Sequence, residues 1–316
     1  MKRSTIFVLL LLLSGTFLMA QSVGTTDFSF LKNQYSPRGA GLAGNLIAVQ
    51  GDVNAMFYNP AGLKSIEEQQ VSINYVDHLL DLQGGQLAYA RSHAKYGTVG
   101  VGLVYFNYGD FQETDDFGEE LGRTFGATEF ALGVSVANTL GEGFDFGVNV
   151  KYIYSSLDSY SASALGLDAG LIYHVPMVTD LQLAFTISNL GIGLQKYADQ
   201  SLKMPLFLRV GGSKKLAHLP LRVSLSLNDL SLQTGDNADL IKRFSISGEF
   251  DVSEPVKFRI GYDNGSNQNL KPLSGRNFGG LSAGVGISVR KMRLDYAFST
   301  SGDLGTQNRL GVMASF

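Results

Sequence analysis

A two-residue alternation of apolar and polar side chains runs through most of this chain, from about Gln69 to the last residue. Such a period places successive side chains on opposite faces of a β-strand. The clearest runs are residues 71–75, 130–137, 144–154, 181–188, 221–228, 256–263 and 281–290. We count about fourteen runs of this kind. The alternation therefore predicts an all-β body over residues 69–316.

The two faces of these runs differ in a way that favours a membrane barrel. One face is apolar, and the other carries small residues and charges of both signs. These charges are Asp145, Lys151, Asp168, Arg209, Arg222, Glu249, Arg259, Arg293 and Asp295. A soluble sandwich would bury the apolar face against a second sheet, whereas a closed barrel turns it to lipid and leaves no unpaired edge in hydrocarbon. We therefore predict a transmembrane, up-and-down antiparallel β-barrel of about 14 strands.

The connections between the runs alternate in length. Long connectors are predicted at 78–85, 109–126, 156–162, 189–204, 230–241, 263–278 and 299–306. Short turns are predicted at 94–97, 140–143, 174–180, 215–220, 251–255 and 290–291. Outer-membrane barrels combine surface loops with short periplasmic turns. The pattern therefore predicts that the long connectors face outward and that both ends of the barrel lie in the periplasm.

The first 20 residues have the features of a signal peptide. Lys2 and Arg3 precede the apolar run Ile6–Leu13, which is too short to span a bilayer, and Ala20 offers a cleavage point before Gln21. An exported chain with 44% hydrophobic residues is neither disordered nor a helical membrane protein. This leaves a periplasmic or secreted domain, or a barrel in the outer membrane.

Cysteine content and charge exclude several classes of function. The chain has no cysteine, which excludes disulfides, thiolate chemistry and acylation as a lipoprotein. Lys and Arg total 25 against 28 Asp and Glu, so no nucleic-acid partner is predicted.

Residues 21–68 do not alternate, and we predict that they form an N-terminal extension and a plug in the barrel lumen. The plug proper is expected at 36–68, with Asp52 capping a helical turn over 53–58. The alternative is a periplasmic tail that only caps the barrel.

The sequence Asn59-Pro60-Ala61-Gly62 is predicted to form a rigid bend in this plug. The Asn59 side chain can bond nearby backbone groups, and Pro60 fixes its own φ. Gly62 can adopt backbone angles that a Cβ would forbid. The bend would press neighbouring apolar side chains against the inner wall.

The last residues, from Leu310 to Phe316, alternate and end on an aromatic side chain. This ending resembles the terminal strand that the barrel assembly machinery recognises, so Phe316 is predicted to be the terminal assembly signal. The alternative is an ordinary final strand.

The small-residue run 38–44, the acidic turn at Asp52 and the sequence 58–63 are similar to the N-terminal segment of FadL-like outer-membrane barrels. Within that group the chain most resembles the PorV/PorQ family of the type IX secretion system. The likeness continues through 107–114, 151–157 and 212–216, and these segments favour a PorQ-like member.

The resemblance implies a non-enzymatic outer-membrane component of the type IX secretion and cell-surface attachment machinery. Its loops would bind protein partners, namely other secretion components and secreted cargo, while outer-membrane lipid surrounds the barrel. The alternative is a FadL-like channel for hydrophobic small molecules, gated by the segment at Asn59-Pro60.

No pattern typical of catalysis or metal binding is present. The four histidines lie far apart, and no Ser or Asp is placed to suggest a triad. Four carboxylates at 115, 116, 119 and 120 do not have calcium-loop spacing, so we interpret them as a solvated charge cluster. We predict no enzyme activity, no cofactor and no metal site.

Overall fold

The structure is a computed structural model that describes residues 26–197, 201–232, 238–270 and 278–316. The predicted signal peptide, residues 1–20, lies outside the described residues. In the part of the chain that is described, no helix is long and apolar enough to cross a membrane.

Fourteen antiparallel strands form a closed barrel in which each strand pairs with its neighbours in sequence and β14 pairs with β1. The strands are β1 (Gln70–Asp77), β2 (Gln83–His93), β3 (Gly97–Thr114), β4 (Glu120–Thr139), β5 (Phe144–Leu157), β6 (Tyr160–His174), β7 (Leu181–Gln195), β8 (Phe207–Lys215), β9 (Leu221–Leu227), β10 (Phe244–Asp251), β11 (Val256–Asp263), β12 (Leu281–Val289), β13 (Met292–Thr300) and β14 (Thr306–Ser315). The predicted fold class is therefore confirmed.

The two faces of the wall are those that the alternation predicts. In β1, Ile73 and Tyr75 are exposed on the outer face, while Ser72 and Asn74 are buried on the inner face. All nine charged residues assigned to the lumen are buried or half-buried. Because β14 pairs with β1, the sheet has no edge at that seam. Every strand therefore has a hydrogen-bonded neighbour on both sides for at least part of its length.

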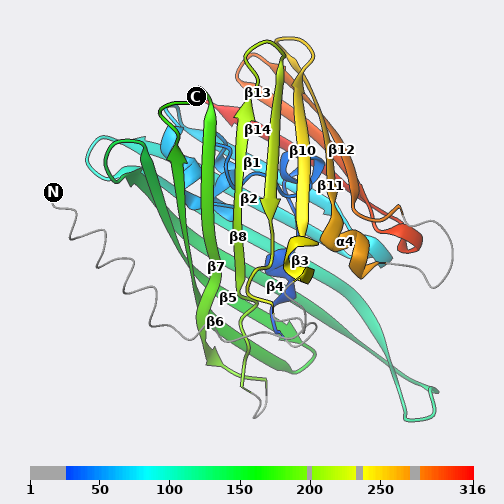
Figure 1. Ribbon diagram of the computed structural model, residues 1–316. Coiled ribbons are helices and arrows are strands. Elements are labelled where there is room, and N and C mark those ends of the chain that lie inside the picture. The colour runs from blue at the N-terminus through cyan, green and yellow to red at the C-terminus, as the bar shows by residue number, and fades with distance from the viewer. Residues whose placement is uncertain (1–25, 198–200, 233–237, 271–277) are drawn as a thin grey trace.

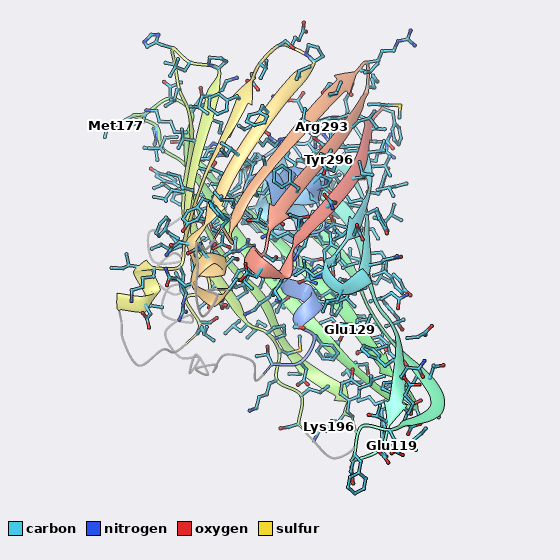
Figure 2. All side chains as sticks on the ribbon, turned by 90° about the vertical axis from the view of Figure 1, so that its right-hand side faces the viewer. Glu119, Glu129, Met177, Lys196, Arg293 and Tyr296 are labelled. Carbon is cyan, nitrogen blue, oxygen red and sulfur yellow. The ribbon has the colours of Figure 1, made fainter. Side chains whose placement is uncertain are left out.

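The wall is uneven in height. Strands β3–β7, which we call the long wall, have 14 to 20 residues each. Strands β8–β14, the short wall, have 7 to 10. In Figure 1 the long wall continues well below the level at which the short wall ends. Figure 2 shows Glu119 at the tip of the β3–β4 hairpin, the loop end, and Met177 at the opposite turn end.

The predicted alternation of connector lengths is wrong at the long wall. The predicted connectors 109–126 and 156–162 are mostly strand, because only 115–119 separates β3 from β4 and only 158–159 separates β5 from β6. Likewise β7 continues to Gln195 instead of ending at 189. Bulges after Asn107 and near Asn189 interrupt the two-residue period there, so the continuing strands resemble loops in the sequence. The predicted short turns are confirmed.

The plug lies inside the ring of strands, where Figure 1 shows it in blue. It contains three short helices: α2 (Pro37–Gly41), η2 (Val53–Phe57) and η3 (Pro60–Ser65). A further turn, η1 (Ser29–Lys32), precedes it. Helix α2 contacts β12 and β13 of the short wall, and η3 contacts β4 and β5 of the long wall. The loop end of the short wall carries α3 (Ala238–Ile241), α4 (Asn264–Asn269) and η5 (Gly302–Leu304), and η4 (Leu79–Asp81) lies between β1 and β2.

Candidate functional site

Arg38 connects the plug to the short wall. It lies in α2, and the Nε and Nη2 atoms of its guanidinium donate to the two carboxylate oxygens of Glu249 in β10, at 2.9 and 2.7 Å. Its Nη1 donates to Asp52 Oδ2 at 3.0 Å. A planar guanidinium that meets a carboxylate through two parallel bonds fixes both distance and orientation. Arg38 therefore sets the position of α2 against the wall.

Asp52 is the fully buried centre of the plug's polar contacts. Its Oδ1 accepts from the Asn54 backbone N–H at 2.9 Å, so it caps η2 as the sequence predicts. Its Oδ2 also accepts from Arg293 Nη2 in β13 at 2.7 Å. Burial raises the pKa of this carboxyl, but Arg293 and Arg38 more than offset burial and hold the pKa well below its usual range. Asp52 is therefore charged at neutral pH.

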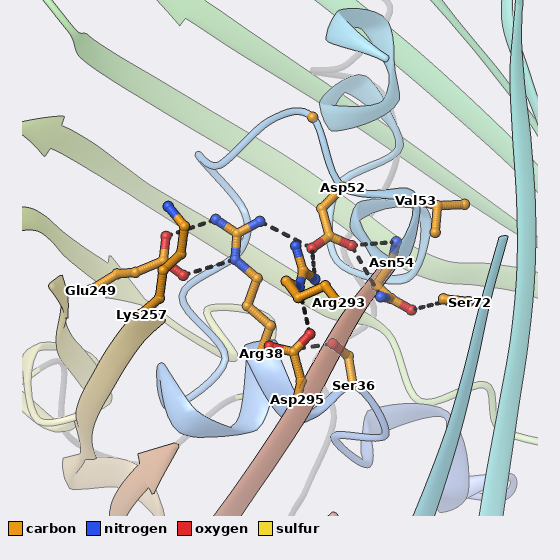
Figure 3. Close-up of polar contacts among 12 residues, drawn as sticks. Ser36, Arg38, Asp52, Val53, Asn54, Ser72, Glu249, Lys257, Arg293 and Asp295 are labelled. Carbon is orange, nitrogen blue, oxygen red and sulfur yellow. Dashed lines mark hydrogen bonds and ion pairs between the residues drawn. The ribbon is translucent and has the colours of Figure 1, made fainter. Parts of the chain in front are cut away.

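The short wall completes this set of charges. Arg259, which has no exposed surface, donates to Glu249 at 2.7 Å and to Asp295 at 2.6 Å. Arg293 Nε also donates to Asp295, at 2.5 Å. We call this set the ion network: Arg38, Asp52, Glu249, Arg259, Arg293 and Asp295. Figure 3 labels all of its members except Arg259. The network's three cations balance its three anions, which buried charges require.

Other polar contacts join the plug to neighbouring strands. Asn54 Oδ1 accepts from Ser72 Oγ and from Asn74 Nδ2, both at 2.8 Å, on β1. Gln50 Nε2 donates to Asp145 of β5 at 2.8 Å. The plug is thus bonded to both sides of the barrel.

Asn59 fixes the bend that the sequence predicts at 59–62. Its buried Oδ1 accepts from the Ala61 backbone N–H at 3.0 Å, which caps η3. Its Nδ2 donates to Ile47 O at 2.7 Å and to Leu171 O of β6 at 3.3 Å. One side chain therefore closes the turn and connects it to the long wall. Pro60 begins η3, where the missing N–H costs nothing.

Glycines in the long wall make room for this bend. A Cβ on Gly147 of β5 would lie 2.2 Å from the Pro60 carbonyl carbon, and one on Gly170 of β6 would lie 1.9 Å from Asn59 Oδ1. Neither distance is possible between non-bonded atoms. We call this pair the glycine seat. The bend at Asn59-Pro60 therefore reaches β5 and β6 at positions where a side chain is missing.

The expected backbone freedom of Gly62 is not used. Its φ is not positive, so the predicted reason for a glycine at this position is wrong. A Cβ there would lie 2.7 Å from Ala55 Cβ and 3.0 Å from Val49 O. Gly62 is required because two turns of the plug pack closely, not because of its backbone angles.

Sequence reasoning missed the cavity between the plug and the loop end of the short wall. Its volume is about 630 Å³. Lys32 and Asp229 on its lining form an ion pair at 3.2 Å, and Arg309 of β14 donates to Ser299 Oγ at 2.9 Å and to Gln34 O. Arg309 is not among the nine charged residues that the sequence assigns to the lumen, although its side chain is on the inner face. The cavity therefore has a charged lining.

The other predicted features lie apart from the plug. Phe316 exchanges backbone bonds with Gln69 at 3.1 and 2.9 Å, and 56% of its surface is exposed. In the hairpin tip, Asp115 accepts from the backbone N–H groups of Phe117 and Glu119, so it shapes its own turn. Among the described residues, no group of three or more His, Asp or Glu is placed to hold a metal ion.

Comparison with solved structures shows the fold. The toluene transporter TbuX of Ralstonia pickettii has a TM-score of 0.61 at 15% identity, over 89% of this chain and 97% of that chain. The toluene transporter TodX of Pseudomonas putida has a TM-score of 0.55 at 12% identity, over 90% and 97%. A Pseudomonas aeruginosa FadL homologue has a TM-score of 0.53 at 12% identity, over 90% and 98%.

Comparison with sequences gives the family. No curated protein matches the chain. The profile of the family described as type IX secretion system protein PorV matches residues 18–217. The preference for a PorQ-like member stays a prediction. The chain therefore belongs to the PorV family of type IX secretion system proteins, as a FadL-like β-barrel of the outer membrane.

Proposed function

We propose that this barrel works without catalysis, as a closed component of the type IX secretion and surface-attachment machinery that binds protein partners at its loop end. The observation that carries the proposal is the ion network, because it fixes the plug across the lumen. Opening the lumen would separate Arg38 from Glu249 and Arg293 from Asp52, and would leave buried charges short of partners. Breaking buried pairs of this kind costs about 3–5 kcal/mol each.

The cavities favour this function over a channel for hydrophobic small molecules. Such a channel needs a mostly apolar pocket of ligand size. The cavity of about 630 Å³ is of ligand size, but charged side chains stand among its apolar ones, including Lys32, Asp229, Asp263 and Arg309. A smaller cavity of about 60 Å³ lies beside the charged groups of Lys151, Asp168 and Arg209. An apolar solute would have to displace water from these ions.

The proposal also assigns the two ends and the processing of the chain. We place the loop end outside the cell, where it meets secretion components and secreted cargo, and the turn end in the periplasm. Residues 1–20 are the signal peptide, 21–68 the extension and plug, and 69–316 the barrel. Phe316 is the terminal assembly signal read by the barrel assembly machinery. Single cysteines at Glu119 and Glu142 test the orientation: only the first should react with an impermeant maleimide on whole cells.

Deleting the chain in its own organism separates the two functions. We expect secreted cargo to be lost from the cell surface while uptake of toluene is unchanged, and we expect the wild-type chain to restore secretion. Normal secretion together with reduced uptake would contradict the proposal and favour the channel.

A further inference from the structure

The loop-end half of β7 has one open edge. Strand β8 pairs with β7 only from Leu181 to Ser188, whereas β6 stays paired with β7 as far as Gln195. Within the described residues, the backbone of 190–195 makes no hydrogen bond to any element other than β6. Because N–H and C=O groups of a strand point alternately to its two sides, this edge presents a row of free donors and acceptors.

The open edge is held in place, and it is not a frayed strand end. It begins at a bulge where Asn189 has φ 62°. The Asn189 backbone N–H donates to Asp168 Oδ1 at 2.7 Å, and its Nδ2 donates to Pro205 O at 2.9 Å. Asp168 in turn pairs with Lys151 at 2.8 Å. These buried contacts direct β7 away from β8 while they keep it on β6.

The described part of the connector after β7 makes no backbone hydrogen bond to the edge. Met204 of this part packs in an interior cluster with Phe28 and Phe30. Leu202 lies against the inner face of Gly193. The outer face of the edge remains exposed and apolar, with 45% of Leu190, 66% of Ile192 and 53% of Leu194 accessible.

The opposite edge of the long wall has the protection that β7 lacks. Beyond Asn107, β3 also has no partner on its β2 side, but this edge carries the carboxylates of Asp110 and Glu113. Charged side chains are a device by which proteins prevent pairing at exposed edges. The β7 edge has no charged residue from Leu190 to Gln195. Of these two edges, only the β7 edge is suited to receive another strand.

The height of the edge agrees with such a role. Unpaired backbone groups are not tolerated in hydrocarbon. The bilayer must fit the short wall, whose strands have 7 to 10 residues. The edge begins where the pairing of β7 with β8 stops, and it extends beyond that level by up to about 20 Å along the strand. It is therefore accessible to an extended segment outside the membrane.

We propose that the β7 edge, Asn189–Gln195, binds an extended, uncharged segment of a partner protein by strand addition, which would give the proposed secretion function its contact site. The partner's backbone pairs with the free groups of β7. Its outward side chains are apolar and pack beside Leu190, Ile192 and Leu194, as cross-strand neighbours do. This inference rests on the proposed function.

The partner is a different protein, since symmetry disfavours a second copy. Two barrels inserted in the same direction hold their β7 strands parallel, and a two-fold axis places equal residues at equal heights. In a parallel ladder, the residues whose N–H and C=O groups point to the partner lie one position out of step between the two strands. Two identical edges at equal heights would present these groups at the same positions, so they cannot form such a ladder. A free segment of another protein has no such restriction.

A pair of matched lysine substitutions tests the proposal. Ile192 and Leu165 face each other across β7 and β6, and both point outward, but only Ile192 is on the open edge. We expect Ile192→Lys to reduce co-purification with the other secretion components at least tenfold, because an added strand would desolvate the lysine. Leu165→Lys should co-purify as the wild type does. Both variants should show wild-type heat-modifiable mobility.

The purified barrel gives an independent measurement with a defined probe. A seven-residue peptide of alternating valine and threonine should slow amide hydrogen exchange at alternate residues of 190–194 in the wild type and not in Ile192→Lys. Equal co-purification of the two lysine variants would overturn strand addition by a partner, and so would a lack of protection by the peptide. The same holds if residue 192 contacts only a second copy of this chain. Failure of the wild-type chain itself to co-purify would instead overturn the proposed function.

Discussion

The long wall and the short wall hold the same plug by different means. The short wall binds it through charge, since Glu249, Arg259 and Arg293 surround Arg38 and Asp52. The long wall has no part in the ion network and makes room for the bend at Asn59-Pro60 with Gly147 and Gly170. Gly261 of the short wall makes room in the same way for the backbone of Leu42 and Ala43. The charged contacts determine how the plug is oriented, and the glycine seat determines how closely it approaches. Predictions that separate these two contributions follow from the largest expected effect to the smallest.

Filling the glycine seat should have the largest effect. In Gly147→Val the new Cβ would overlap the Pro60 backbone, which has no flexible atoms to move aside. We expect a loss of more than about 3 kcal/mol in the free energy of unfolding, together with faster proteolysis of the plug. Urea titration and limited proteolysis measure these changes.

Gly248→Val is the matched control for this substitution. A Cβ on Gly248 would meet side-chain atoms of Leu221, Phe250 and Ile260, at 3.2, 3.4 and 3.9 Å on the outer face. An equal loss of stability in both variants would show that valine harms these strands in general, and the seat would have no special role.

Removing the central charge should cost somewhat less. Asp52→Asn leaves Arg38 and Arg293 with one carboxylate partner each, Glu249 and Asp295. We expect a loss of about 3 kcal/mol in the free energy of unfolding. The barrel should still assemble, but its plug should be cleaved faster in limited proteolysis. Asp251→Asn, whose half-buried carboxylate pairs with Lys215 and Lys257, should change the stability by less than about 1 kcal/mol. Similar losses in the two variants would remove the distinction between fully buried and partly exposed pairs.

Mild acid should leave the plug in place. The pKa of Asp52 is depressed in the folded protein, because Arg293 and Arg38 outweigh the effect of burial. Its contribution to stability is therefore fully present above the unfolded pKa of about 3.9 and is lost only as the pH falls toward the folded pKa. Proteolysis of the plug by an acid-active protease should be unchanged between pH 7 and about 5. Release of the plug near pH 6 would contradict this assignment.

A change at the seam between β14 and β1 should have the smallest effect on the folded barrel. The Phe316 side chain is exposed, so Phe316→Ala should alter the free energy of unfolding by at most about 0.5 kcal/mol. If the residue is an assembly signal, the assembled fraction in cells should still fall severalfold. An unchanged assembled fraction, measured by heat-modifiable mobility, would make the last strand an ordinary one.

The barrel could be predicted from sequence because lipid imposes a strict period. Residues such as Ile73 and Ser72 must alternate wherever one face meets hydrocarbon and the other the lumen. Beyond the bilayer that requirement ends. The β3–β4 hairpin carries polar residues on both faces, and the bulge at Asn189 reverses the alternation within β7. Strand there is recognisable only from pairing, which one sequence does not reveal.

The plug was predictable as a segment, but its contacts were not. Asp52 and Asn59 have local roles as helix caps, and their positions in the sequence predict these roles. The partners of Arg38 lie elsewhere: Glu249 is 211 residues away. A long-range pair of this kind depends on the register of the whole barrel. The same holds for Gly147 and Gly170, which in sequence are only small residues on an inner face.

Conductance across a planar bilayer tests the central claim, that the plug closes a barrel which passes no solute. We compare the full-length chain with a variant that lacks Ser36–Glu68, and heat-modifiable mobility shows whether each barrel is assembled. The account predicts that the assembled deletion variant conducts ions while the full-length protein stays nearly closed. Similar conductance from the two proteins would contradict it.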